Sequence, residues 1–255
     1  MQFLLLMVSM ASIASTALAV PPGWSADTAK FYSGVFKEIL SARKENKDPR
    51  SPKCDLSKAV LPSTNEPLPP VPEGQKLLHV TIGRGTQNYT CSSPSDKPKA
   101  IGAVATLFDV NCIASNYPYL LSLLPNIALR LPAPIFPPHP RSKPFTFGPN
   151  NMKVAGSHFF NGQGVPIFDL GADGSAAVEK IAAVDAPKGA MKGIPGQMNG
   201  AVQWLMLTAV KESTGKAKSV YRVNTAGGKA PATCEGVEAG KVLEMQYATE
   251  YWFYG

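Results

Sequence analysis

The hydrophobic and polar positions of the C-terminal segment alternate in the way that predicts a β-strand. In VLEMQYATEYWFY, residues 242–254, one face carries Met245, Tyr247, Thr249, Tyr251 and Phe253. The other face carries Gln246, Ala248, Glu250, Trp252 and Tyr254. Successive side chains of a strand point to opposite sides, and here both sides carry aromatic rings. We therefore expect this strand to be covered on both faces.

Short segments of strand character recur along the rest of the chain. The candidate strands are 76–82, 87–91, 100–110, 145–148, 152–160, 165–170, 178–186, 201–210 and 219–225. Most are bounded by Gly, Pro, Asn or Asp, and helices between them are few. This arrangement predicts a mainly β fold, either an antiparallel β-sandwich or a barrel-like domain. We expect a single β-rich domain over 20–255.

Two segments have helical periodicity instead. Over 26–43, Phe31, Val35 and Ile39 recur every four residues and form an apolar stripe. We expect this N-terminal helix to pack on the sheet, and a helix lying on a membrane surface is the alternative. Residues 117–131 predict a short helix interrupted by Pro125. The proline-rich stretches 44–75 and 132–144 predict extended chain.

The N-terminus has the features of a secretory signal peptide. Residues 1–19 are apolar and end in Ala17-Leu18-Ala19, a cleavage signal of the small-x-small type. A membrane anchor is the alternative, but the apolar run is short and Pro21-Pro22 follows it at once. We expect a secreted, extracellular protein that begins at Val20 and has no transmembrane anchor.

The cysteines and one asparagine fit an extracellular location. Two disulfides can join Cys54, Cys91, Cys112 and Cys234 in three connectivities, and buried free thiols are the alternative. Because no Cys-x-x-Cys pair occurs, we expect no metal site. The sequon Asn88-Tyr89-Thr90 predicts a glycan at Asn88, unless the sequon is unused.

The net charge of +7 does not by itself predict a nucleic-acid partner. Lysines and arginines are scattered, and the densest cluster, RKENKDPRSPK at 43–53, also contains acidic residues. This pattern favours a solvated surface, so we expect no nucleic-acid binding. Weak attraction to acidic wall polymers or membrane surfaces is the alternative.

The stretch KLLHVTIGRG resembles the start of a dinucleotide-binding fingerprint. That fingerprint requires a third glycine and a following helix. Here Asn88 takes the third position, and the residues beyond it have no helical face. The alternative is a hairpin between 76–82 and 87–91, with Gly83 and Gly85 in its turn. We expect this hairpin and no cofactor.

Several motifs occur in an order that is similar to one family. They are GRGTQNYTC, GAVATLFDVNC, GSHFF with PIFDL, VQWLMLTAV, SVYRVNTAGGKAPATC and YATEYWFYG. Over roughly 24–255 the chain resembles a secreted family of unknown function from filamentous fungi, whose members are often labelled "malate dehydrogenase" automatically. The resemblance implies a largely β extracellular fungal protein with no settled activity, and it transfers no catalytic residues.

Candidate chemistry is sparse. The sequence has no Gly-x-Ser-x-Gly nucleophile elbow. His158 and Asp169 are weak catalytic candidates, because a hairpin through NGQGVP would let them face each other; a buried structural hydrogen bond is the alternative. His79, within a strand, reads as structural, and His139, between prolines, as exposed and inert.

Aromatic residues offer another kind of site. Trp24, Trp204, Trp252, Tyr221, Tyr247, Tyr251 and Tyr254 could line a pocket or stack on sugar rings. An aromatic β core explains the same residues and is the reading we favour. Together, the observations favour a non-enzymatic extracellular protein that binds a wall glycan, small molecule or host component. An effector role during colonisation is part of this hypothesis. A secreted hydrolase with an unrecognised acid/base pair is the alternative, and the dehydrogenase reading is disfavoured.

Overall fold

A computed structural model describes residues 54–131, 145–147 and 150–255, and single positions at 30, 33, 34, 37, 40 and 41. The elements below belong to the compact unit Glu38–Gly255. They are η1 (Leu56–Lys58), β1 (Leu77–Thr90), β2 (Lys99–Asp109), α3 (Asn111–Asn116), α4 (Pro118–Arg130), β3 (Phe145–Phe147), β4 (Asn150–Met152), β5 (Val154–Phe160), β6 (Pro166–Asp169), η2 (Gly171–Asp173), β7 (Ser175–Val184), β8 (Trp204–Ala209), β9 (Ser219–Gly227) and β10 (Val242–Tyr254). The predicted signal peptide, the helix over 26–43 apart from those single positions, Trp24 and His139 lie outside the described residues.

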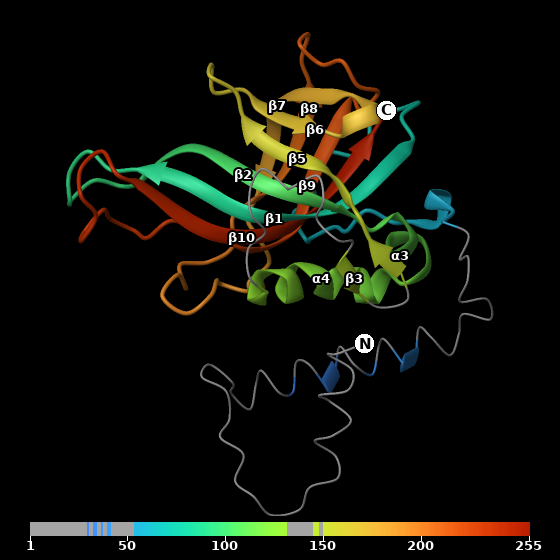
Figure 1. The fold of residues 1–255 in the computed structure, drawn as a ribbon, viewed down its shortest axis with the longest axis horizontal. Helices are drawn as coiled ribbons and strands as arrows, with labels where there is room; N and C mark the ends of the chain where they lie inside the picture. The colour runs from blue at the N-terminus through green and yellow to red at the C-terminus, as the bar shows by residue number, and fades with distance from the viewer. Residues whose placement is uncertain are drawn as a thin grey trace, which may run out of the picture. The chain divides into compact units, whose positions relative to one another are not determined.

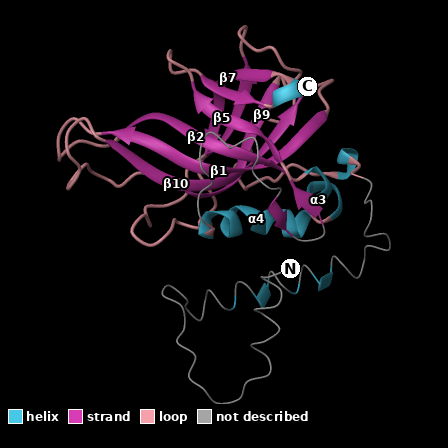
Figure 2. Cartoon of the chain, in the orientation of Figure 1, coloured by secondary structure: helices cyan, strands magenta, loops and turns pink. Residues whose placement is uncertain are grey.

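Strands dominate the described part, and eight of them close into a barrel (Figures 1 and 2). Around the barrel, β1, β2, β5, β6, β7, β8, β9 and β10 follow one another in chain order, and β10 pairs with β1 to close it. All of these pairs are antiparallel. The barrel is therefore an up-and-down meander, which confirms the predicted mainly β, antiparallel, barrel-like fold.

The predicted hairpin at Gly83 and Gly85 is wrong. Strand β1 runs without interruption from Leu77 to Thr90, and both glycines are paired with β2 and β10. A Cβ at Gly85 would overlap the carbonyl oxygen of Val104, and one at Gly83 would overlap the ring of Tyr251. The glycines therefore allow close approach to a neighbouring strand and a ring, not a turn.

The two faces of β10 are both buried, as its sequence predicts. Residues 247–254 are buried without exception. The inward face, with Tyr247, Tyr251 and Phe253, joins the main apolar cluster inside the barrel. On the outward face, Ala248 packs with Leu129 of α4, while Trp252 is 1% exposed. The aromatic residues singled out in the sequence are core residues wherever the structure describes them.

Helix α4 lies along the outside of the barrel (Figure 1). Pro125 lies inside this helix and does not interrupt it, so that prediction is wrong. The proline removes one backbone hydrogen bond, and burial of the apolar face of the helix against the barrel offsets the loss. Arg84 of β1 is 3% exposed and donates to the carbonyl oxygens of Ala128 (2.9 Å) and Leu131 (3.1 Å) at the helix end.

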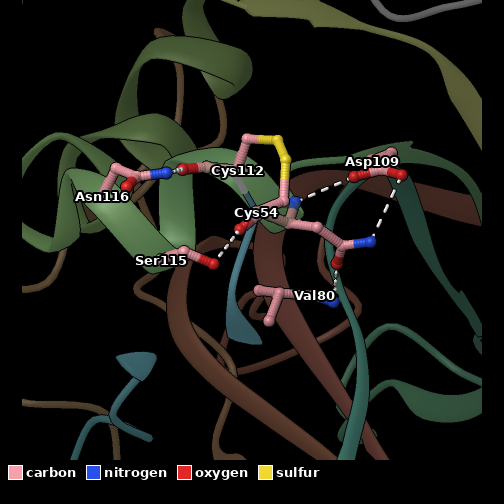
Figure 3. The surroundings of a disulfide bond; sticks show 7 residues. Cys54, Val80, Asp109, Cys112, Ser115 and Asn116 are labelled. Atoms are coloured by element: carbon pink, nitrogen blue, oxygen red, sulfur yellow. Dashed lines mark hydrogen bonds between the residues drawn. A yellow bond between two sulfur atoms is a disulfide. The ribbon is translucent and has the colours of Figure 1, made fainter. Parts of the chain in front are cut away.

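Two disulfides resolve the connectivity that the sequence left open. Cys54 pairs with Cys112 of α3, and Cys91 pairs with Cys234. Figure 3 shows the first of them near Val80 and Asp109. Asn111 accepts from the backbone N–H of Val80 (2.7 Å) and donates to Asp109. The Cys54–Cys112 disulfide joins the segment that precedes the barrel to α3. In the described part of the chain, no helix is long and apolar enough to cross a membrane.

Candidate functional site at one end of the barrel

Inside the barrel, three neighbouring strands change from buried to accessible at the same end. The interior cluster includes Val178 of β7, Leu207 of β8 and Val220 of β9. Two residues further along each strand, and so on the same inward face, lie Lys180, Leu205 and Arg222; Leu205 pairs with Arg222, whereas Lys180 pairs with Leu207, one step nearer the interior cluster. Lys180 is exposed, and Leu205 and Arg222 are half-buried. We call the end marked by these three residues the Arg222 end.

Arg222 is held in place by a backbone carbonyl. Its Nε and Nη2 both donate to the oxygen of Gln203, at 3.1 and 2.9 Å. On the neighbouring strand β10 it pairs with Tyr251, whose hydroxyl is 3.0 Å from that of Tyr247. Burial raises the pKa of both phenols, and the positive charge of Arg222 partly opposes that rise. Both tyrosines are therefore neutral hydrogen-bonding groups at ordinary pH.

His158 points into the barrel and is 4% exposed. Its ring stacks on Phe168, with 4.2 Å between centroids, and its Nδ1 lies 2.9 Å from the carbonyl oxygen of Ile167. Burial lowers the pKa of His158 to about 4, and the charge of Arg222 also lowers it. Since a carbonyl can only accept, Nδ1 carries the proton and the imidazole is neutral. This is the buried structural hydrogen bond that the sequence offered as the alternative.

Asp169 does not face His158. The hairpin between β5 and β6 forms as predicted, but its register pairs Asp169 with Ser157 and His158 with Phe168. Neighbouring positions on a strand point to opposite faces, so His158 is inside the barrel and Asp169 outside. Asp169 is exposed and accepts from the backbone N–H of Gly171 (2.9 Å), a turn contact. The predicted juxtaposition is wrong, and no acid/base pair results from it.

Glu250 forms a second polar cluster on the outward face of β10. It is 0% exposed, and its two oxygens accept from Asn224 Nδ2 (2.7 Å) and Trp252 Nε1 (2.9 Å). Asn224 has a positive φ of 47°, at a bulge where β9 and β10 slip in register. Burial raises the pKa of Glu250 to about 7, although both hydrogen bonds lower it. The carboxyl group of Glu250 is therefore shielded from solvent.

The remaining sequence candidates lie elsewhere. His79 of β1 pairs with Asp173 (3.3 Å) at the end of the barrel opposite to the Arg222 end. Asn88 lies within β1, paired on both sides, and its Oδ1 is buried, so a glycan there stays a prediction. Strand β1 leads to β2 and not to a helix, so the GRG stretch lacks the strand–turn–helix context of a dinucleotide site. Among the residues that the structure describes, no group of three or more His, Cys, Asp or Glu side chains gathers to hold a metal.

Sequence reasoning missed Arg222 and the burial of Glu250. Arg222 lies two residues after Val220 and therefore on the same face of β9. Alternation along the strand predicts that the two residues share a face, but it does not say that this face is the interior one. For Glu250 the signal was present: it lies on a strand that we expected to be covered on both faces.

Comparison with known proteins identifies a family but no activity. A family model described as "Protein of unknown function (DUF3455)" matches residues 72–255, which include the whole barrel. The chain belongs to the DUF3455 family. No curated protein and no solved structure matches it. The resemblance to a family of unknown function is thus confirmed at that level.

Proposed function

We propose that this DUF3455 protein is a secreted, non-enzymatic fungal protein that binds a small molecule at the Arg222 end of its barrel. The observation that carries the proposal is the change of exposure there, from Val220 to Arg222 on β9 and in parallel on β7 and β8. Eight-stranded barrels are wide enough for their side chains to fill or for one small ligand to enter. In this chain Phe168, Phe253, Tyr251 and Tyr247 fill the interior, and the half-buried Leu205 and Arg222 lie next to that cluster.

Secretion and an effector role rest on other observations. The predicted signal peptide and two disulfides support an extracellular location, since disulfides persist in oxidising compartments. The fungal source and the role in colonisation rest on the family resemblance. N-terminal sequencing of protein recovered from a culture medium tests secretion, and the expected first residue is Val20.

A melting-temperature screen of the secreted protein tests the binding function. The panel holds NADH, metal ions, chitin and glucan oligomers, and apolar small molecules. A ligand that binds only the folded state stabilises it by about 2.7 kcal/mol at 100 times its dissociation constant. We expect one class of small molecules to raise the melting temperature. A shift with glycan oligomers alone would redirect the proposal to the fungal wall, and no shift at all would contradict it.

A further inference from the structure

The Arg222 end carries positively charged side chains without an ion-pair partner in the described part of the chain. Lys180 and Arg222 share the inward face of β7 and β9 there. Within 54–131, 145–147 and 150–255, no carboxylate lies at ion-pair distance from Arg222. Asp185 lies near, but it accepts from the side-chain amide of Gln203 (3.0 Å). A half-buried guanidinium without a counter-ion favours the approach of an anion.

The guanidinium of Arg222 is oriented and still has donors to offer. Its two hydrogen bonds to Gln203 fix the plane of the group. A guanidinium has five N–H donors, so these contacts and one to the Tyr251 phenol leave donors for a ligand. The fork geometry matches the two oxygens of a carboxylate better than a single acceptor.

Beside Arg222 the barrel interior is filled by uncharged aromatic side chains, and Leu205, which pairs with Arg222, is the half-buried apolar neighbour. Tyr247 and Tyr251, whose hydroxyls lie 3.0 Å apart, are 0% and 1% exposed and belong to the core. The ring of His158 lies 5.7 Å from that of Phe160 and 5.8 Å from that of Tyr251, measured between centroids. With Leu205 as the accessible apolar neighbour, the Arg222 end suits an apolar ligand body better than a heavily hydroxylated one.

We infer that the Arg222 end binds a small organic acid, with the carboxylate on Arg222 and an apolar body against Leu205, the half-buried neighbour paired with Arg222. This inference rests on the proposed function and names the ligand class for the same site. Lys180, which is exposed and pairs with Leu207, adds positive charge near this end and attracts the anion, and the net charge of +7 reinforces the attraction at long range.

Titration calorimetry on the full secreted chain tests this with benzoate and its neutral near-isostere, benzamide. We expect benzoate to bind at least about tenfold more tightly than benzamide, because only the carboxylate pairs with the guanidinium. Arg222→Gln should weaken benzoate binding about tenfold or more and leave benzamide binding unchanged. Arg222→Lys should retain part of the affinity.

Lys211→Gln is the matched control. It removes one positive charge from the exposed loop that joins β8 to β9 at the opposite end, and benzoate binding should not change. Should Arg222→Gln fail to fold, Lys180→Gln serves as a second variant, with an expected loss of about two- to fivefold that disappears in high salt.

The outcomes separate the inference from the proposed function. Equal binding of benzoate and benzamide, or unchanged benzoate binding by Arg222→Gln, would overturn the carboxylate assignment and leave small-molecule binding in place. If inorganic phosphate binds as tightly as benzoate, the inference that the ligand has an apolar organic body is overturned. Binding of none of these probes, together with an unresponsive screen, would remove both.

Discussion

Arg222 of β9 and Tyr251 of β10 are directly paired on neighbouring strands of the barrel, with both side chains on the inward face. Burial and, to a lesser extent, the same guanidinium lower the pKa of His158, whose ring lies 5.8 Å from that of Tyr251 between centroids. One cation thus influences groups on two other strands, β5 and β10, which lie far apart in the sequence. This coupling is open to direct titration.

The His158 pKa should rise when Arg222 is replaced by Gln. It should stay below 6.5, the ordinary value for histidine, because burial is the larger cause of its depression to about 4. The imidazole signals in an NMR pH titration measure it, and Lys211→Gln should leave the value unchanged. An identical His158 pKa in wild type and Arg222→Gln would contradict the placement of the two groups.

Glu250 should make the protein less stable as pH rises. Its pKa is about 7 in the folded state against 4.5 ordinarily, so the folded state holds the proton more tightly than the unfolded state. Its stabilising effect is full below pH 4.5 and is lost as pH rises towards 7, by about 3 kcal/mol in all.

Glu250→Gln removes this dependence, since an amide can accept from Trp252 and donate to a reoriented Asn224. Urea unfolding from pH 4 to pH 8 should show the variant gaining on wild type as pH rises. Asp169→Asn, at an exposed carboxyl, is the control and should show no such trend. A variant that is less stable than wild type at pH 8 would mean that the ionised carboxylate stabilises the fold.

Gly85→Ala should destabilise the barrel by at least about 2 kcal/mol, because the new Cβ would meet the backbone of β2 at Val104 and Ala105. Gly162→Ala is the matched control: it lies in the hairpin loop after β5 with nothing within 4 Å of the new Cβ, and should change stability little. Thermal unfolding compares the two. Equal stability of both variants would revive the turn interpretation of the GRG stretch.

Arg84→Gln should cost about 2–4 kcal/mol, since it leaves buried carbonyls at the end of α4 without their donor. Lys241→Gln, which breaks an exposed ion pair with Glu238 (2.6 Å), should cost less than about 1 kcal/mol. Denaturant titrations measure both. A small effect at Arg84 would show that α4 is held by its apolar face alone.

Much of the fold could be predicted because its signals are local. Alternation over 242–254 predicted β10 and the burial of both its faces, and turn residues separated most of the other strands. The GRG stretch failed because glycine serves two purposes, and only the position of Val104 on the next strand tells close approach from a turn. Pro125 failed likewise, since the packing that sustains α4 comes from the barrel.

The site was predicted less well because it depends on register and closure. The hairpin that joins His158 to Asp169 was correctly expected, yet a single step of register decides whether the two face each other. Arg222 becomes part of a site only once β9 is inserted between β8 and β10 and its inward face is fixed. Neither relationship is written in one segment of the sequence.

Hydrogen–deuterium exchange of the secreted protein, with and without saturating benzoate, tests the central claim most directly. The account predicts slower exchange at the Arg222 end, in the segments around Lys180, Leu205 and Arg222, and no change in the loop 210–218 at the opposite end. Unchanged exchange at the Arg222 end, or protection confined to 210–218, would contradict a ligand site there.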